Sequence, residues 1–167
     1  MTKIPEVNLV FRIYDEFNTK STYSEDLFKG KRVVVFSLPG AFTPTCSTKQ
    51  LPSYDKRYKE FTDLGIDDVF CISVNDGFVL RAWASDLGLK NVLMLPDGNG
   101  EFTEQMGMLV SKNNLGFGKR SWCYARVGGD CEIEKMIIED GKIGDCSHDP
   151  YEVSDPDTVL NYLKENA

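Results

Sequence analysis

The residues most able to do chemistry in this sequence are a cysteine and the threonine and proline that precede it. The stretch LPGAFTPTCS places Pro39, Thr43 and Cys46 between an apolar run, RVVVFSL, and a segment with helical spacing. The first turn of a helix carries a partial positive charge and unpaired N–H groups, which lower the pKa of a thiol. A thiolate at this point would be a nucleophile, and the alternative is a small cysteine that only packs.

The two neighbours of the cysteine could complete such a site. The Thr43 hydroxyl, three residues earlier, could hydrogen-bond both a thiolate and an incoming oxygen atom. Pro39 and Pro44 stiffen the loop, and Pro39 could also cover the sulfur and limit which molecules reach it. Sites of this kind usually lie at the edge of the sheet in α/β proteins.

Strands and helices alternate along the chain and would position the cysteine at such an edge. Strands are expected at 7–14, 32–38, 66–76, 91–102, 120–127 and 132–140, and 111–119 is expected to be a loop. Helices are expected at 22–31, 45–64, 77–88, 102–108 and 154–166. Pro52 should kink or split the second of them, and Ser154 and Asp155 should cap the last.

This order predicts an α/β fold in which a central mixed sheet is flanked by helices. The last two strands form an antiparallel hairpin, which the thioredoxin-like architecture has and a fully parallel doubly wound sheet lacks. No repeat, low-complexity tract or linker-like change in composition interrupts the chain. We therefore expect one domain over residues 1–167.

Charge and composition narrow the class of partner. There are 19 basic and 26 acidic residues, a net charge of −7, which argues against binding to nucleic acid or to an anionic membrane. No apolar run approaches the roughly 20 residues that span a bilayer, and the start of the chain does not have the pattern of a secretory signal. The five cysteines are odd in number and include no CxxC pair, so a reducing, cytoplasmic location is expected.

The stretch PGAFTPTCS resembles the active-site motif of the peroxiredoxins. SVND at 73–76 and PDGNGEFT at 96–103 extend the resemblance to the type II, or atypical two-cysteine, class, in particular to members that use glutaredoxin or glutathione. The resemblance implies a thioredoxin-like fold, a homodimer, and a peroxidase acting on hydrogen peroxide and alkyl hydroperoxides. It implies that Cys46 is oxidised to a sulfenic acid, aided by Thr43 and Pro39, and is regenerated by glutathione, glutaredoxin or thioredoxin.

The sequence departs from this family at one functional position. The arginine that normally completes the family's site aligns with Cys123, next to Tyr124. Arg120 and Arg126 are each three residues away, and an odd offset in a regular strand points to the opposite face, so neither takes over unless a bulge or register shift re-aims it. A low-turnover redox sensor or a binding module on the same fold is therefore the alternative function.

Two further cysteines are candidates to resolve the sulfenic acid as a disulfide. Cys71 lies 25 residues after Cys46, as in plant-like members of the class, but in the middle of an apolar strand, where local opening would be required. Cys123 would need its Cα within about 7 Å of that of Cys46. A one-cysteine mechanism with an external thiol is favoured over Cys71.

The remaining features predict little chemistry. Cys131 and Cys146 are expected to be exposed thiols, and with Cys123 and His148 they lack the short spacings of a zinc site, so neither a metal nor a cofactor is expected. Three aromatic residues are expected to form an exposed dimer contact, and a place in the core is the alternative for the last of them. They are Phe42, Phe78 and Trp83.

Overall fold

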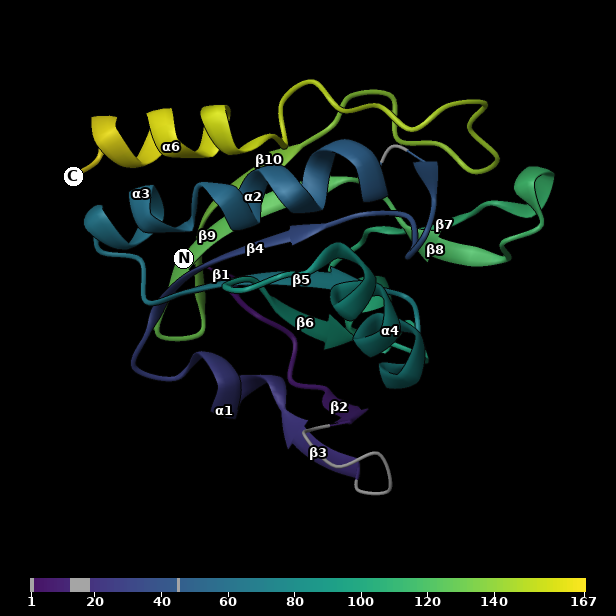
Figure 1. Ribbon diagram of the computed structural model, residues 1–167, viewed down its shortest axis with the longest axis horizontal. Helices are drawn as coiled ribbons and strands as arrows, with labels where there is room; N and C mark the ends of the chain where they lie inside the picture. The colour runs from purple at the N-terminus through teal and green to yellow at the C-terminus, as the bar shows by residue number, and fades with distance from the viewer. Residues whose placement is uncertain (1, 13–18, 45) are drawn as a thin grey trace.

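The computed structural model describes residues 2–12, 19–44 and 46–167, and its centre is a mixed six-stranded sheet (Figure 1). The strands are β1 (Thr2–Lys3), β4 (Arg32–Ser37), β5 (Asp68–Ser73), β6 (Leu93–Pro96), β9 (Tyr124–Gly129) and β10 (Glu132–Ile138), in the order β1-β10-β9-β4-β5-β6. Strands β4, β5 and β6 run parallel, whereas β9 is antiparallel to both β4 and β10. The expected α/β fold with a central mixed sheet is therefore confirmed.

Helices and one hairpin cover the two faces of this sheet (Figure 1). One face carries α2 (Leu51–Lys56), α3 (Tyr58–Asp63) and α6 (Pro156–Glu165). The other carries α1 (Ser24–Phe28) and the hairpin of β2 (Asn8–Arg12) and β3 (Thr19–Tyr23). Two more helices, α4 (Gly77–Leu87) and α5 (Glu101–Gln105), follow β5 and β6 along the chain.

The sequence of β4 shows why this strand occupies the centre of the sheet. Val34 and Phe36 belong to the core that includes α2, α3 and α6, whereas Val33 and Val35 belong to the core that includes Phe28 of α1. Successive side chains of a strand point to opposite faces, so a strand that is buried on both faces carries mainly apolar side chains. The near-continuous apolar run is the consequence.

The helix expected over 45–64 is divided into three parts. The chain forms a π-helical segment, η1 (Cys46–Gln50), before α2 begins at Leu51 with Pro52 in its first turn. Proline is accepted there because the first N–H groups of a helix have no intrahelical acceptor. The split that Pro52 predicts is therefore present. A second break at Arg57, whose φ and ψ are −99° and 12°, separates α2 from α3 and was not predicted.

The region before β9 differs from the expectation of a loop followed by one strand. Strand β7 (Leu109–Ser111), a short 3-10 helix η2 (Asn113–Leu115) and β8 (Lys119–Ser121) form a separate antiparallel hairpin. The chain leaves this hairpin at Trp122 and enters the main sheet only at Tyr124. The expected strand over 120–127 is thus two strands with different partners, which a local apolar pattern cannot distinguish.

The expected capping of the last helix is half correct. Asp155 is the N-cap residue of α6, but Ser154 is buried and its hydroxyl donates to the Glu139 carboxylate instead.

Among the described residues no helix has the length and apolar character required to cross a membrane.

Candidate active site

The loop between β4 and η1 carries the residues that the sequence singled out. Strand β4 ends at Ser37, Pro39 follows in the loop, and the backbone of Cys46 begins η1. The cysteine therefore stands at the start of a helical segment, as its pattern predicts. Its side chain, and Thr45 as a whole, lie outside the described residues, so the site is built here from the groups that surround this loop.

Thr43 is buried and bonded to the loop's own backbone. Its Oγ1 donates a hydrogen bond of 2.8 Å to the carbonyl oxygen of Gly40, three residues earlier. This bond closes the turn that brings the chain from Pro39 toward the helix. The hydroxyl proton is directed to the backbone in this arrangement, and the predicted bonds from Thr43 to a thiolate and a peroxide stay predictions.

An asparagine that follows the neighbouring strand β5 also holds this loop. The Ala41 N–H donates to Oδ1 of Asn75 at 3.0 Å, and the Ser73 hydroxyl donates to the same oxygen at 2.6 Å. Ser73 is the last residue of β5, so the SVND motif at 73–76 anchors the loop to the sheet. The sequence interpretation quoted this motif only for its resemblance and gave Asn75 no role.

Arg120 reaches the loop from the β7–β8 hairpin. Its Nη1 donates to the carbonyl oxygen of Pro39 at 3.3 Å, and its Nε donates to the carbonyl oxygen of Phe117 at 3.2 Å. The guanidinium also lies over the Phe117 ring, 5.2 Å from its centroid. A Cβ at residue 40 would overlap with Nη1, so Gly40 is what lets the side chain approach. The half-burial of Arg120 lowers its pKa.

The roles of Arg120 and Arg126 stay predictions, but the structure places the two side chains differently. The sequence allowed Arg120 to reach the site only if the strand was irregular, and the strand is interrupted there. Because β8 and β9 are separate strands, the side-chain alternation does not run from Cys123 back to Arg120. Arg126 lies within β9 and packs over the ring of Phe28, 4.8 Å from its centroid, in the core on the α1 side. Only one of the two flanking arginines is therefore brought to the loop.

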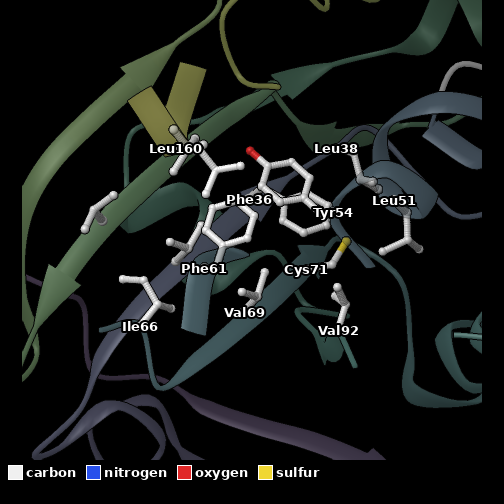
Figure 2. Close-up of a cluster of buried hydrophobic side chains, with 14 of the residues drawn as sticks. Phe36, Leu38, Leu51, Tyr54, Phe61, Ile66, Val69, Cys71, Val92 and Leu160 are labelled. Atoms are coloured by element: carbon white, nitrogen blue, oxygen red, sulfur yellow. The ribbon is translucent and has the colours of Figure 1, made fainter. Parts of the chain in front are cut away.

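The two candidate resolving cysteines are buried. Cys71 is 0% exposed in the middle of β5, and Figure 2 shows it among Tyr54, Leu51 and Val92. Cys123 is 2% exposed, and its carbonyl oxygen accepts a hydrogen bond from the Glu139 N–H. Their pairing with Cys46 stays a prediction.

The other two cysteines differ from each other. Cys131 is half-buried, with Sγ 3.3 Å from the carbonyl oxygen of Glu25. The expectation that Cys146 is exposed was wrong, because it packs in a third apolar cluster with Met108 and Trp122. This cluster forms only when the loop after β10 folds back on the β7–β8 hairpin, so spacing in the sequence cannot predict it.

The aromatic residues separate into surface and core. Phe42 is 53% exposed and Phe78 is 59% exposed, whereas Trp83 is fully buried. The rings of Phe42 and Trp83 lie 6.3 Å apart. The core interpretation therefore holds for Trp83, and Phe42 and Phe78 remain as a surface that a partner could cover.

A mixed sheet with an antiparallel C-terminal hairpin, helices on both faces and a cysteine at a strand-to-helix turn defines a thioredoxin-like protein with a thiol site. Residues 2–160 match the Redoxin family. A peroxiredoxin from a Synechocystis strain is 50% identical over 97% of this chain and 89% of its own length. A hybrid peroxiredoxin from Haemophilus influenzae is 50% identical over 96% of this chain and 64% of its own length.

Solved structures agree with these relatives. The Plasmodium falciparum antioxidant protein, a 1-Cys peroxiredoxin, superposes with a TM-score of 0.93 at 35% identity, over 98% of both chains. Reduced Prx3 from Vibrio vulnificus in complex with hydrogen peroxide gives 0.88 at 32% identity, over 99% of this chain and 95% of that one. The chain belongs to the peroxiredoxin family and is a thiol-dependent peroxidase.

Proposed function

We propose that this chain, as one domain of the type II class, reduces hydrogen peroxide and alkyl hydroperoxides through Cys46. A Cys46 thiolate attacks one peroxide oxygen, the S–O bond forms as the O–O bond breaks, and the leaving oxygen is protonated to water or an alcohol. Thr43 and Pro39 border the sulfur and the bound peroxide. The observation that carries the proposal is the position of Cys46 at the start of η1, in a loop fixed by Asn75 and Arg120.

An external thiol then regenerates the enzyme. A first thiol attacks the Cys46 sulfenic acid, forming a mixed disulfide and releasing water, and a second thiol releases the cysteine and leaves as a disulfide. Glutathione with glutaredoxin is the proposed reductant, with thioredoxin as the alternative. The burial of Cys71 and Cys123 supports this route, because buried thiols are usually inert, and so does the 1-Cys description of the Plasmodium relative.

Peptide mapping under non-reducing conditions tests the mechanism. One equivalent of hydrogen peroxide is added to the reduced protein, and the oxidation state of each cysteine is read by mass spectrometry. Oxidation at Cys46 alone, trapped as a sulfenic acid, is expected, and Cys71→Ser and Cys123→Ser should keep their turnover with glutathione. A disulfide from Cys46 to either residue would replace the external route with an internal one, and an unreacted Cys46 would end the proposal.

Steady-state kinetics separates the enzyme from the low-turnover sensor that the substitution at position 123 suggests. An enzyme consumes peroxide continuously with glutathione and glutaredoxin, whereas a sensor is oxidised once and stops. Replacing glutaredoxin with thioredoxin in the same assay identifies the preferred reductant. The matched control is Cys46→Ser, which should consume no peroxide with either.

The cytoplasm is the proposed location of the protein.

The exposed aromatic residues support a homodimer. Phe42 and Phe78 lie on the loop before η1 and on the first turn of α4, near the proposed site. Covering two large apolar side chains favours association. Sedimentation should show a dimer that Phe78→Ser weakens, with Leu115→Ser, another exposed apolar residue, as the control. A monomeric native protein would contradict the dimer.

A further inference from the structure

The turn that joins β9 to β10 carries a cysteine where glycine is the usual residue. Gly129 pairs with Glu132, so Asp130 and Cys131 alone form the turn, and both have a positive φ, 50° and 68°. A two-residue hairpin turn of this kind favours Asp-Gly, because glycine adopts the left-handed conformation at low cost. The side chain of Cys131 therefore occupies its position against the preference of the backbone.

This side chain lies on the wall of a pocket of about 380 Å³. The thiol is half-buried, with Sγ 3.3 Å from the carbonyl oxygen of Glu25. The pocket is bounded by the N-terminal segment, by α1 and by the turn, and a space of this size accommodates a small molecule. Five charged side chains of both signs border it: Lys3, Glu6, Glu25, Lys29 and Asp130.

Most of these charges are available to a ligand. Four of the five make no ion pair within the described part of the chain, namely Lys3, Glu6, Glu25 and Lys29. The fifth, Asp130, accepts a hydrogen bond of 2.7 Å from the Gly30 N–H. A molecule that carries both carboxylates and an ammonium group would find partners of opposite charge around the same thiol.

A buried cation lies beneath this pocket. Arg126 is 1% exposed, and its Nε and Nη2 atoms have no hydrogen-bond partner among the described residues. A Cβ at residue 128 would lie 3.1 Å from Nη1, so the guanidinium extends along β9 toward the turn. Burial and the nearby Glu25 and Asp130 raise the pKa of the Cys131 thiol, and Arg126 is close enough to oppose this rise. A fixed positive charge close to the sulfur favours the thiolate.

We propose that Cys131 is a second thiol site, at which glutathione is bound as a mixed disulfide. The inference goes beyond the proposed function, in which Cys131 takes no part. Glutathione carries a thiol, an ammonium group and two carboxylates, which match the cysteine and the glutamates and lysines around it. The Cys131 thiolate attacks one sulfur of glutathione disulfide, a new S–S bond forms as the old one breaks, and the second glutathione leaves as a thiolate that takes up the proton lost by Cys131.

The raised pKa of Cys131 makes this modification slow to form and slow to be removed. Only the small thiolate fraction attacks at neutral pH. When another thiol attacks the glutathione sulfur, Cys131 must leave, and a thiol with a high pKa leaves slowly. We therefore expect a persistent adduct rather than a catalytic intermediate.

Disulfide exchange at each cysteine tests the proposal. The reduced protein is incubated with glutathione disulfide at mildly alkaline pH, and each cysteine peptide is quantified by mass spectrometry under non-reducing conditions. A parallel incubation uses hydroxyethyl disulfide, which reacts in the same way but is uncharged. The ratio of the two rates at Cys131 is divided by the same ratio for the protein unfolded in guanidinium chloride, which removes the difference in intrinsic reactivity. This normalised ratio should be about five, as expected for two exposed charge contacts.

Three variants assign the parts of the site. Lys3→Glu combined with Lys29→Glu should bring the normalised ratio down to about one, whereas Lys119→Glu combined with Lys164→Glu, two exposed lysines outside the pocket, should leave it unchanged. Arg126→Met should slow both disulfides alike, because it removes the charge close to the sulfur. Cys131→Gly should abolish the adduct in a folded protein, because this turn favours glycine.

Four results would overturn the assignment. They are the absence of glutathione on Cys131, a normalised ratio near one in the native protein, a ratio unchanged by the Lys3 and Lys29 substitutions, and an unchanged rate in Arg126→Met. The assay needs neither peroxide nor turnover, so its outcome is independent of the peroxidase proposal. An inactive peroxidase that still forms the adduct would refute the proposed function and keep the second thiol site.

Discussion

Replacing Arg126 with methionine would measure the cost of burying a positive charge that has no counter-ion among the described residues. Arg126 is 1% exposed and lies over the Phe28 ring, and within the described part of the chain its Nε and Nη2 atoms have no hydrogen-bond partner. A buried charge that lacks a partner destabilises the folded state, because the protein interior does not replace its hydration. Methionine has a similar length and no charge.

The size of the effect follows from the pKa of this arginine. Burial lowers it well below its ordinary value, to about 10, and at about 1.4 kcal/mol per pH unit this corresponds to roughly 3 kcal/mol against the charged form. The contact with Phe28 returns about 1 kcal/mol, which the methionine variant loses. We therefore expect Arg126→Met to raise the free energy of unfolding by about 2 kcal/mol.

The lowered pKa of Arg126 also determines how its contribution to stability changes with pH. Below pH 10 the arginine is charged in both the folded and the unfolded state, so the penalty is fully present. As the pH rises above about 10, the unfolded chain binds more protons than the folded one, so the contribution of this group to stability rises with pH. The gain from Arg126→Met should therefore be constant across neutral pH.

Urea unfolding at pH 7, followed by circular dichroism, is the assay. A gain of about 2 kcal/mol should appear as a higher midpoint at an unchanged slope, and as a melting temperature higher by about 4–8 °C. Arg81→Met, on the exposed surface of α4, is the matched control and should change stability by less than about 0.5 kcal/mol. Destabilisation of Arg126→Met by more than 1 kcal/mol would refute the reasoning, since it would mean that the guanidinium is well solvated or paired.

Two further predictions concern buried polar contacts of the loop after β10. Lys112 is fully buried and paired with Asp149 at 2.6 Å, so Asp149→Asn should lower the free energy of unfolding, measured in urea, by about 3–5 kcal/mol. Asp157→Asn removes one partner of an exposed pair and should lower it by at most about 1 kcal/mol, so equal losses would contradict the prediction. Burial raises the pKa of Glu139, but hydrogen bonds from the Ser154 hydroxyl and from three backbone N–H groups outweigh it and lower the pKa below 4.5. The stabilisation that the Glu139 carboxylate provides is present above pH 4.5 and is lost as the pH falls through its folded pKa. The melting temperatures of the native protein and of Glu139→Gln should therefore converge in acid, and a difference that does not change with pH would refute this.

Local chemistry in the sequence determined the central elements of the fold and the position of Cys46 at the start of a helical segment. The run of valines predicted a strand buried on both faces, and Pro52 predicted a kink or a split in the helix around it. Gly88 ends α4 in the left-handed conformation that glycine adopts at low cost. These features depend on neighbours in the chain, so the pattern of residue types is sufficient to predict them.

Only the tertiary structure decided which arginine meets the site. Arg120 and Pro39 are 81 residues apart, and they meet because the β7–β8 hairpin folds against the end of β4. Alternation along one regular strand would place Arg120 on the opposite face, and the sequence could not show that the chain changes partners between Ser121 and Tyr124. The contact depends on the path by which the chain returns to the sheet, and that path is set by packing between distant elements rather than by any local pattern.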